Sequence, residues 1–91
     1  MPKITLFQND KFGGKYLTIL ETQNNLKNSN FNDITSAVIV CSGNWVLYED
    51  SDFKGQQWVV KENGGPSSDG LYPSYKDWGG KNDSVSSIKP V

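Results

Sequence analysis

The chain states two short patterns twice in the same order, and this repetition restricts the folds it can adopt. The first pattern is an aromatic residue, four polar residues, Phe, one further residue and Gly. It occupies Phe7–Gly14 and again Tyr48–Gly55. The second pattern, Asn-Asp-x-x-Ser, occupies residues 32–36 and 82–86. Because each copy is long enough to be a supersecondary unit, we predict two related halves that share one core.

The composition limits the class of protein. A chain of 91 residues forms one small domain, and its net charge of −1, with no Arg, argues against nucleic acid or an anionic membrane as a partner. No apolar run reaches membrane-spanning length and the first residues do not form a signal peptide, so we expect a cytoplasmic protein. Cys41 is the single cysteine, which excludes an intrachain disulfide.

The local patterns predict an all-β fold. Short runs rich in β-branched and aromatic residues alternate with turn residues, and no stretch carries a helical stripe. The predicted strands lie around Ile4–Leu6, Leu17–Ile19, Ala37–Val40, Trp45–Tyr48 and Trp58–Val60. The polar segment Gln23–Asn30 allows one helical turn at most. Many short strands in a small chain are typical of a sandwich of two sheets.

The chain is predicted to form a single domain, residues 1–91. Motif one covers about residues 3–41 and motif two about residues 44–90, and they meet at Ser42-Gly43-Asn44. This junction is too short to act as a flexible linker, so the motifs should pack together. The segment Glu62–Tyr75, rich in Gly, Pro and Ser, is predicted to be a surface loop.

The second pattern supplies oxygen atoms of the kind that calcium prefers. Calcium takes six to eight oxygen ligands from carboxylates, carbonyls, hydroxyls and water. The candidate groups are the side chains of Asn32, Asp33, Ser36, Asn82, Asp83 and Ser86 and the backbone carbonyls of Ile34 and Ser84. With about one carboxylate per site, we expect dissociation constants on the order of 10⁻⁶ to 10⁻⁴ M.

The two patterns together resemble the βγ-crystallin family, in particular its single-domain, calcium-binding, non-lens members. The likeness covers roughly residues 3–89. It implies a double Greek-key βγ-crystallin-like sandwich of two four-stranded antiparallel sheets, with a strand exchanged between the motifs. It also implies that the first pattern forms a folded hairpin whose Gly takes a conformation that other residues resist.

The resemblance further implies two Ca²⁺ sites, each joining the Asn-Asp-x-x-Ser loop of one motif to the hairpin of the other. Gln8 or Glu49 would give a backbone carbonyl, Asp33 or Asp83 a carboxylate, Ile34 or Ser84 a carbonyl, and Ser36 or Ser86 a hydroxyl. Asn32 and Asn82 would brace the loops.

The first copy departs from the family pattern at its last position. The second copy ends in Ser87, whereas the first has Ala37. If this Ser ties the loop down, the first copy is less rigid. We therefore expect the site built on Ser86 to be the better formed of the two.

Other functions remain open at this stage. One alternative is a calcium-independent structural protein of the crystallin type, and another is a carbohydrate- or protein-binding module that uses an exposed Trp78 and the Glu62–Tyr75 loop. We predict that the chain is not an enzyme, because it has no His and because Cys41, expected to be buried, has no base to activate it. We expect a monomer whose partners are calcium ions.

Overall fold

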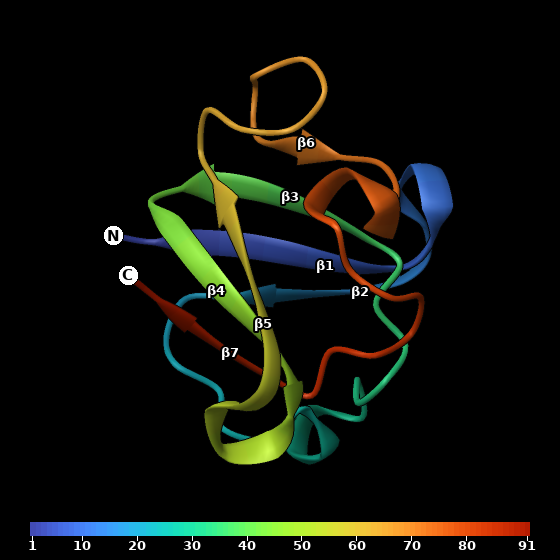
Figure 1. Cartoon of the computed structure of the whole chain (residues 1–91), viewed down its shortest axis with the longest axis vertical. Helices are drawn as coiled ribbons and strands as arrows, with labels where there is room; N and C mark the ends of the chain where they lie inside the picture. Colours follow the sequence, from blue (N-terminus) through green and yellow to red (C-terminus); the bar gives the residue numbers. More distant parts are fainter.

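Two antiparallel sheets pack face to face in the computed structural model, which describes residues 1–91 (Figure 1). The first sheet has the strand order β2-β1-β3-β6 and the second the order β5-β4-β7. The strands are β1 Lys3–Asn9, β2 Gly13–Ile19, β3 Ala37–Ser42, β4 Asn44–Asp50, β5 Lys54–Lys61, β6 Leu71–Tyr72 and β7 Ser87–Pro90. The all-β prediction and all five predicted strands are confirmed.

Four short 3₁₀ turns complete the fold, and no helix is long and apolar enough to cross a membrane. The turns are η1 Asp10–Phe12, η2 Leu26–Ser29, η3 Ser51–Phe53 and η4 Tyr75–Trp78. The turn η2 lies within the segment predicted to form one turn at most. Asn25 caps it by accepting a hydrogen bond from the backbone N–H of Lys27, as expected for an Asn before a helical turn.

The sheets differ from the expected pair of four-stranded sheets, because the second has three strands. In place of the fourth strand, Gln23 makes a single bridge to Ile88, with backbone hydrogen bonds of 2.8 and 2.9 Å. The polar residues around Gln23 have low strand propensity and lead directly into the capped turn η2, so the pairing stops after one residue.

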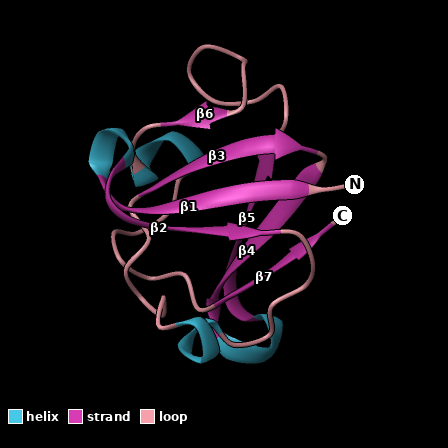
Figure 2. Ribbon diagram, turned by 180° about the vertical axis from the view of Figure 1, so that it is seen from behind, coloured by secondary structure: helices cyan, strands magenta, loops and turns pink.

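Segments are exchanged between the halves, as the resemblance implied. β6 belongs to motif two but pairs with β3 in the first sheet, and Gln23 belongs to motif one but bridges to β7 in the second sheet. Figure 2 shows β6 at one edge of the first sheet, beside β3. Each half therefore depends on the other to complete its sheet.

One apolar core lies between the sheets, because residues alternate between the two faces of each strand. Ile4 and Leu6 point inward from β1, and Trp45 and Leu47 point inward from β4; all four are 0 % exposed.

Two expectations about individual side chains were wrong. Trp78 was expected to be exposed, but it is 8 % exposed, because η4 turns it against Tyr72, where the two rings meet edge to face. Cys41 was expected to be buried, but it is exposed. Since Val40 points inward from β3, strand alternation turns Cys41 outward. The interaction module therefore loses the exposed tryptophan on which that hypothesis relied.

The hairpins of the two halves have nearly the same geometry. Phe7 packs on Phe12, and Tyr48 packs on Phe53, both with ring centroids 5.4 Å apart and planes inclined by 68°. The glycine at the end of each copy of the first pattern has a positive φ, which is +75° at Gly14 and +79° at Gly55. The repeated pattern thus specifies a repeated structure.

Candidate metal centre

Both hairpins carry a β-bulge at the residue predicted to offer a carbonyl ligand. The β1–β2 pairing shifts at Gln8, and the β4–β5 pairing shifts at Glu49. A bulge leaves its extra residue without a partner across the ladder and changes the direction of the strand. The predicted carbonyl donors therefore lie where the sheet is locally interrupted.

The two Asn-Asp-x-x-Ser loops bond to each other in a symmetric way. The backbone N–H of Asp33 donates to the carbonyl of Val85 at 3.0 Å, and the N–H of Asp83 donates to the carbonyl of Thr35 at 3.2 Å. Residues about 50 positions apart in the sequence are thereby held in contact. The loops, far apart in the sequence, form one structural unit.

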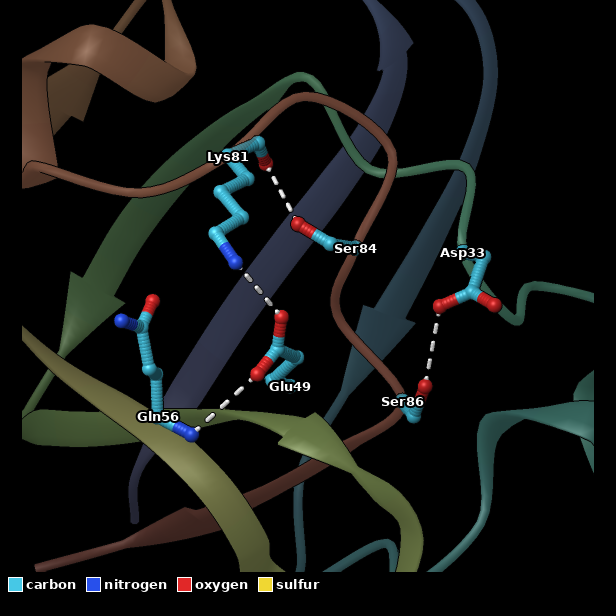
Figure 3. Close-up of polar contacts among 6 residues, drawn as sticks. All are labelled: Asp33, Glu49, Gln56, Lys81, Ser84 and Ser86. Carbon is cyan, nitrogen blue, oxygen red and sulfur yellow. Dashed lines mark hydrogen bonds and ion pairs between the residues drawn. The ribbon is translucent and has the colours of Figure 1, made fainter.

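Each predicted serine hydroxyl donates a hydrogen bond to the aspartate carboxylate of the other half. Ser86 Oγ donates to Asp33 Oδ1 at 3.0 Å (Figure 3). Ser36 Oγ donates to Asp83 Oδ1 at 3.1 Å and to Asn82 Oδ1 at 2.7 Å. Two oxygen clusters result, one around Asp33 and Ser86 and the other around Asp83 and Ser36; we call them site B and site A.

Each serine is also attached to the hairpin of its own half. The N–H of Ser36 donates to the carbonyl of Phe7 at 2.8 Å, and the N–H of Ser86 donates to that of Tyr48 at 2.9 Å. This differs from the expectation that a whole loop serves the opposite hairpin. Because the two loops cross, each loop divides the side chains of its Asp and its Ser between the two sites.

The asparagine of each loop bonds to the aspartate that follows it. The amide of Asn32 donates to Asp33 Oδ2 at 3.1 Å, and that of Asn82 donates to Asp83 Oδ2 at 3.4 Å. These bonds hold the carboxylates in place, as expected of bracing residues. Ile34 and Ser84 follow the aspartates directly, and Ser84 Oγ closes its loop on the carbonyl of Lys81 at 2.8 Å.

The side chains at the two bulges brace the hairpins. Gln8 Oε1 accepts from the N–H of Lys15 at 3.1 Å, and Glu49 Oε1 accepts from the N–H of Gln56 at 3.5 Å. The second carboxylate oxygen of Glu49, Oε2, accepts a hydrogen bond from Lys81 Nζ at 3.0 Å, and the two side chains form an ion pair (Figure 3). The hydrogen bond and charge of Lys81, with the bond from Gln56, lower the pKa of the Glu49 carboxyl below its ordinary value.

Ser87 ties down the second hairpin. Its Oγ donates to the carbonyl of Asp50 at 2.6 Å and accepts from the N–H of Phe53 at 3.0 Å. The first half has Ala37, which is fully buried and has no hydroxyl to make these bonds. The structure thus gives Ser87 the tying role inferred from the sequence.

A pocket of about 380 Å³ opens at site B, and all the residues around it are polar. They are Asn25, Lys27, Asn32, Asp33, Asp50, Ser51 and Ser86. Four of these residues, Asn25, Lys27, Asp50 and Ser51, were not predicted as part of the site. Asp50 could have been found from its place beside Glu49 in the first pattern, whereas the polar segment around η2 carries no motif.

The chemistry of both clusters fits a hard cation. The donors are carboxylate, hydroxyl and amide oxygens, without His or Cys. No group of three or more His, Cys, Asp or Glu side chains converges in the molecule. An ion held here would therefore depend on hydroxyl and carbonyl oxygens and on water as well as on carboxylates.

Comparisons with known proteins agree with this architecture. Residues 3–91 match the protein family described as Beta/Gamma crystallin. The Beta/gamma-crystallin of Ciona intestinalis is 38% identical over 89 residues, covering 98% of each chain. Gamma-crystallin N of Mus musculus is 33% identical over 89 residues, and this chain spans 45% of its length.

Solved structures give the same result. The beta gamma crystallin from Ciona intestinalis superposes with a TM-score of 0.88 at 37% identity, covering 98% of this chain and 99% of that one. A betagamma-crystallin from an archaeon superposes with a TM-score of 0.86 at 27% identity, covering 99% and 98% of the two chains. The fold is thus shared along the whole length with single-domain proteins.

Proposed function

Because the chain belongs to the beta/gamma-crystallin family, we propose that it binds two calcium ions that stabilise the fold. This family consists of crystallin-type structural domains and is not an enzyme family. The observation that carries the proposal is the crossed pairing of Ser86 with Asp33 and of Ser36 with Asp83. An ion at either site would bind oxygen atoms from both halves and so favour the folded chain.

The proposed ligand sets follow from this pairing. Site B would use the carboxylate of Asp33 and the hydroxyl of Ser86, together with the backbone carbonyl of Glu49 at the adjacent bulge. Site A would use Asp83, Ser36 and the carbonyl of Gln8 in the same way. The carbonyls of Ile34 and Ser84, next to the carboxylates, would add further oxygens, and water would complete the shells.

At each site, a bound ion would replace the hydrogen bond between the serine and the aspartate with coordination of both side chains to the ion. At each site, the serine hydroxyl donates a hydrogen bond to the aspartate carboxylate. A cation needs lone pairs from both groups, so the hydroxyl proton must turn away when the ion binds. Because the apolar core and the paired strands specify the backbone, little backbone change should accompany binding.

The same hydrogen bonds favour a second candidate, a structural domain that does not need calcium. Each serine hydroxyl bonds directly to the aspartate carboxylate of the other half, and a domain that binds no calcium could keep these bonds. A chain of this kind would fold and persist unchanged in chelator. Calcium titration separates the two functions.

The test is isothermal calorimetry with calcium on the chain and on Asp33→Asn and Asp83→Asn. We expect two ions to bind the unchanged chain and one site to be lost or strongly weakened in each variant. Glu21→Gln is the matched control, since it removes one negative charge from an exposed residue outside both sites and should keep both ions.

Selectivity gives a further criterion. Magnesium should compete poorly, because it resists dehydration and demands a tighter octahedral shell. Absence of calcium binding by the unchanged chain would establish the calcium-independent structural domain instead.

A further inference from the structure

A single asparagine of the chain is followed by glycine. Asn63 precedes Gly64 in the segment that joins β5 to β6, and Figure 1 shows this segment as a loop that stands out beyond β6. Every other asparagine is followed by a residue with a side chain. Gly64 has no Cβ to shield its backbone nitrogen, so this nitrogen can approach the side-chain amide of Asn63 closely.

The side chain of Asn63 is exposed, so water has access to it. Asparagine side chains elsewhere are held by hydrogen bonds. Asn25 accepts from the N–H of Lys27, and Asn32 and Asn82 each donate to the aspartate that follows them. The least hindered asparagine of the sequence therefore lies on an exposed loop.

Two hydrogen bonds close the turn around Asn63. The N–H of Gly64 donates to the carbonyl of Lys61 at 3.0 Å, and the N–H of Lys61 donates to Tyr72 Oη at 3.0 Å. A nitrogen that donates its hydrogen to a carbonyl is poorly placed to attack a neighbouring amide, so the turn has to open first. Exposed loops with few apolar contacts are among the parts of a protein that open most readily.

We propose that Asn63 is a site of spontaneous modification, at which water converts the asparagine to aspartate or isoaspartate and ammonia is released. The backbone nitrogen of Gly64 bonds to the side-chain carbonyl carbon of Asn63. The bond from that carbon to the amide nitrogen breaks, and ammonia leaves with the proton that the Gly64 nitrogen gives up. Water then opens the cyclic imide at either of its two carbonyls. No metal ion takes part, so the reaction is independent of the proposed calcium sites.

Opening of the imide at one carbonyl gives aspartate with the main chain unchanged, and opening at the other gives isoaspartate, which adds one carbon to the main chain. The structure has no room for this carbon. Gly64 lies against Tyr72, since a Cβ built on Gly64 would be 2.1 Å from Tyr72 Oη. Tyr72 is 4 % exposed and pairs with Val38 in the first sheet. Isoaspartate at position 63 should therefore loosen β6 at the edge of that sheet.

A second junction in the same loop provides a comparison within the chain. Asp69 is the one aspartate followed by glycine. Gly70 is buried, and its N–H donates to the carbonyl of Gly64 at 2.9 Å, while Asp69 Oδ1 accepts from the N–H of Leu71 at 3.2 Å. A carboxylate also loses its oxygen less readily than an amide loses ammonia. Asp69 should therefore stay unchanged while Asn63 reacts.

The test is incubation of the full chain at neutral pH, followed by peptide mass spectrometry that separates the aspartate and isoaspartate forms. Asn63 should react before every other asparagine and before Asp69. Tyr72→Phe removes the acceptor of the Lys61 N–H, so the turn should open more often and the rate at Asn63 should rise by about two- to tenfold. Asn63→Gln is the matched control, because its longer side chain forms the ring far less readily, and it should give no product at this position.

The purified products test the structural effect. The isoaspartate form should melt about 4–8 °C lower than the unchanged chain, with faster hydrogen exchange at the Val40 amide, which donates to the carbonyl of Gly70 at 2.8 Å. Asn63→Asp has the new charge without the extra carbon and should melt like the unchanged chain.

Three results would overturn the proposal. One is reaction at another asparagine as fast as at Asn63, and another is an intact Asn63 in the folded chain after the chain unfolded in denaturant has reacted. The third is an unchanged rate in Tyr72→Phe that circular dichroism shows to be folded, because the turn would then not control the reaction. An isoaspartate form with the melting temperature of the unchanged chain would overturn the effect on β6.

Discussion

At the scale of single residues, the two halves share the same unusual backbone angles. The two loop aspartates have φ of 56° at Asp33 and 53° at Asp83, and the two hairpins have φ of 58° at Lys11 and at Asp52. Few residues other than Gly take the left-handed region, and Asp and Asn tolerate it better than most. An Asn at position 33 or 83 removes the charge without adding backbone strain, whereas Ala there would add it.

A buried hydroxyl without a partner distinguishes one copy from the other. Thr35 is 0 % exposed and its Oγ1 has no hydrogen-bond partner, while its counterpart Val85 is also 0 % exposed. We expect Thr35→Val to raise the free energy of unfolding by about 1 kcal/mol, because it removes an unpaired buried polar group. Chemical unfolding in chelator measures this. Val85→Thr, the reverse exchange, should destabilise, and a loss of stability in Thr35→Val would show that the hydroxyl has a partner.

At the scale of the elements, the hairpins share a framework but are fastened differently. The aromatic pairs and bulges are common to both, but only the second hairpin has the Ser87 tie and a lysine, Lys89, over its rings at 5.2 and 5.7 Å. A cation over an aromatic face is stabilising. The second hairpin should therefore open less often than the first.

Removal of the tie tests this difference. Ser87→Ala should lower the free energy of unfolding by about 1–2 kcal/mol, because the N–H of Phe53 and the carbonyl of Asp50 lose their partner. Hydrogen exchange at the Phe53 amide should become faster. Ala37→Ser is the complementary change in the first half. Unchanged hydrogen exchange at the Phe53 amide in Ser87→Ala would contradict the tying role of Ser87.

The ion pair between Glu49 and Lys81 gives the second hairpin a pH dependence that the first lacks. The pKa of the Glu49 carboxyl is lowered in the folded chain, so its contribution to stability is fully present above the ordinary value of 4.5. The contribution is lost as the pH falls through the lowered pKa. The effect is small, since Lys81 is largely exposed.

The free energy of unfolding, measured against pH in the unchanged chain and in Glu49→Gln, would detect this contribution of the ion pair. The variant keeps an acceptor for Gln56, as Gln8 does for Lys15 in the first half, but it loses the charge. The fall in stability below pH 4.5 should be smaller in Glu49→Gln than in the unchanged chain. Lys81→Met should raise the pKa of Glu49 toward its ordinary value, and an unchanged pKa would show that the ion pair does not form in solution.

At the scale of the whole molecule, the crossed loops join the halves at the proposed sites. A ligand that binds only the folded chain adds about 2.7 kcal/mol per site at a hundred times its dissociation constant. Two sites filled to that degree add about 5 kcal/mol, and each kcal/mol moves the melting temperature of a domain this size by about 4–8 °C. We expect calcium to raise the melting temperature by about 20 °C or more.

Thermal melting in chelator and in millimolar calcium measures this shift. The far-ultraviolet circular dichroism should stay nearly constant, because the paired strands and the apolar core specify the secondary structure. A shift of less than about 3 °C would leave the calcium-independent structural domain as the better account.

The sequence predicted the parts of the molecule that the repeat marks. The hairpins and the serine and aspartate loops follow from patterns that occur twice. The strands β6 and β7 were missed, because Leu71–Tyr72 has two residues and Ser87–Pro90 has one apolar residue before a proline. Neither carries the alternation that identifies a strand, and both are fixed by partners from the rest of the chain.

The site was predicted in its residue types but not in its arrangement. Nothing in a linear pattern shows that Asp33 and Ser36, three positions apart, serve different clusters. The pocket residue Lys27 comes from a turn without a motif and reaches the site only because η2 lies beside the second hairpin. There, the N–H of Asp52 donates to the carbonyl of Asn24 at 2.8 Å. Such proximity is a property of the folded chain.

The exchange of segments between the halves has a consequence for the ancestry of the fold. A polypeptide with a single motif could cover its core by pairing with an identical copy, and symmetry would make the two proposed cation sites of that pair identical. When the two copies are fused in one gene, their sequences no longer have to be identical. The contrasts of Asn9 with Asp50 and of Ala37 with Ser87 are differences that an identical pair could never acquire, and through them a duplicated site can become two sites with separate tasks.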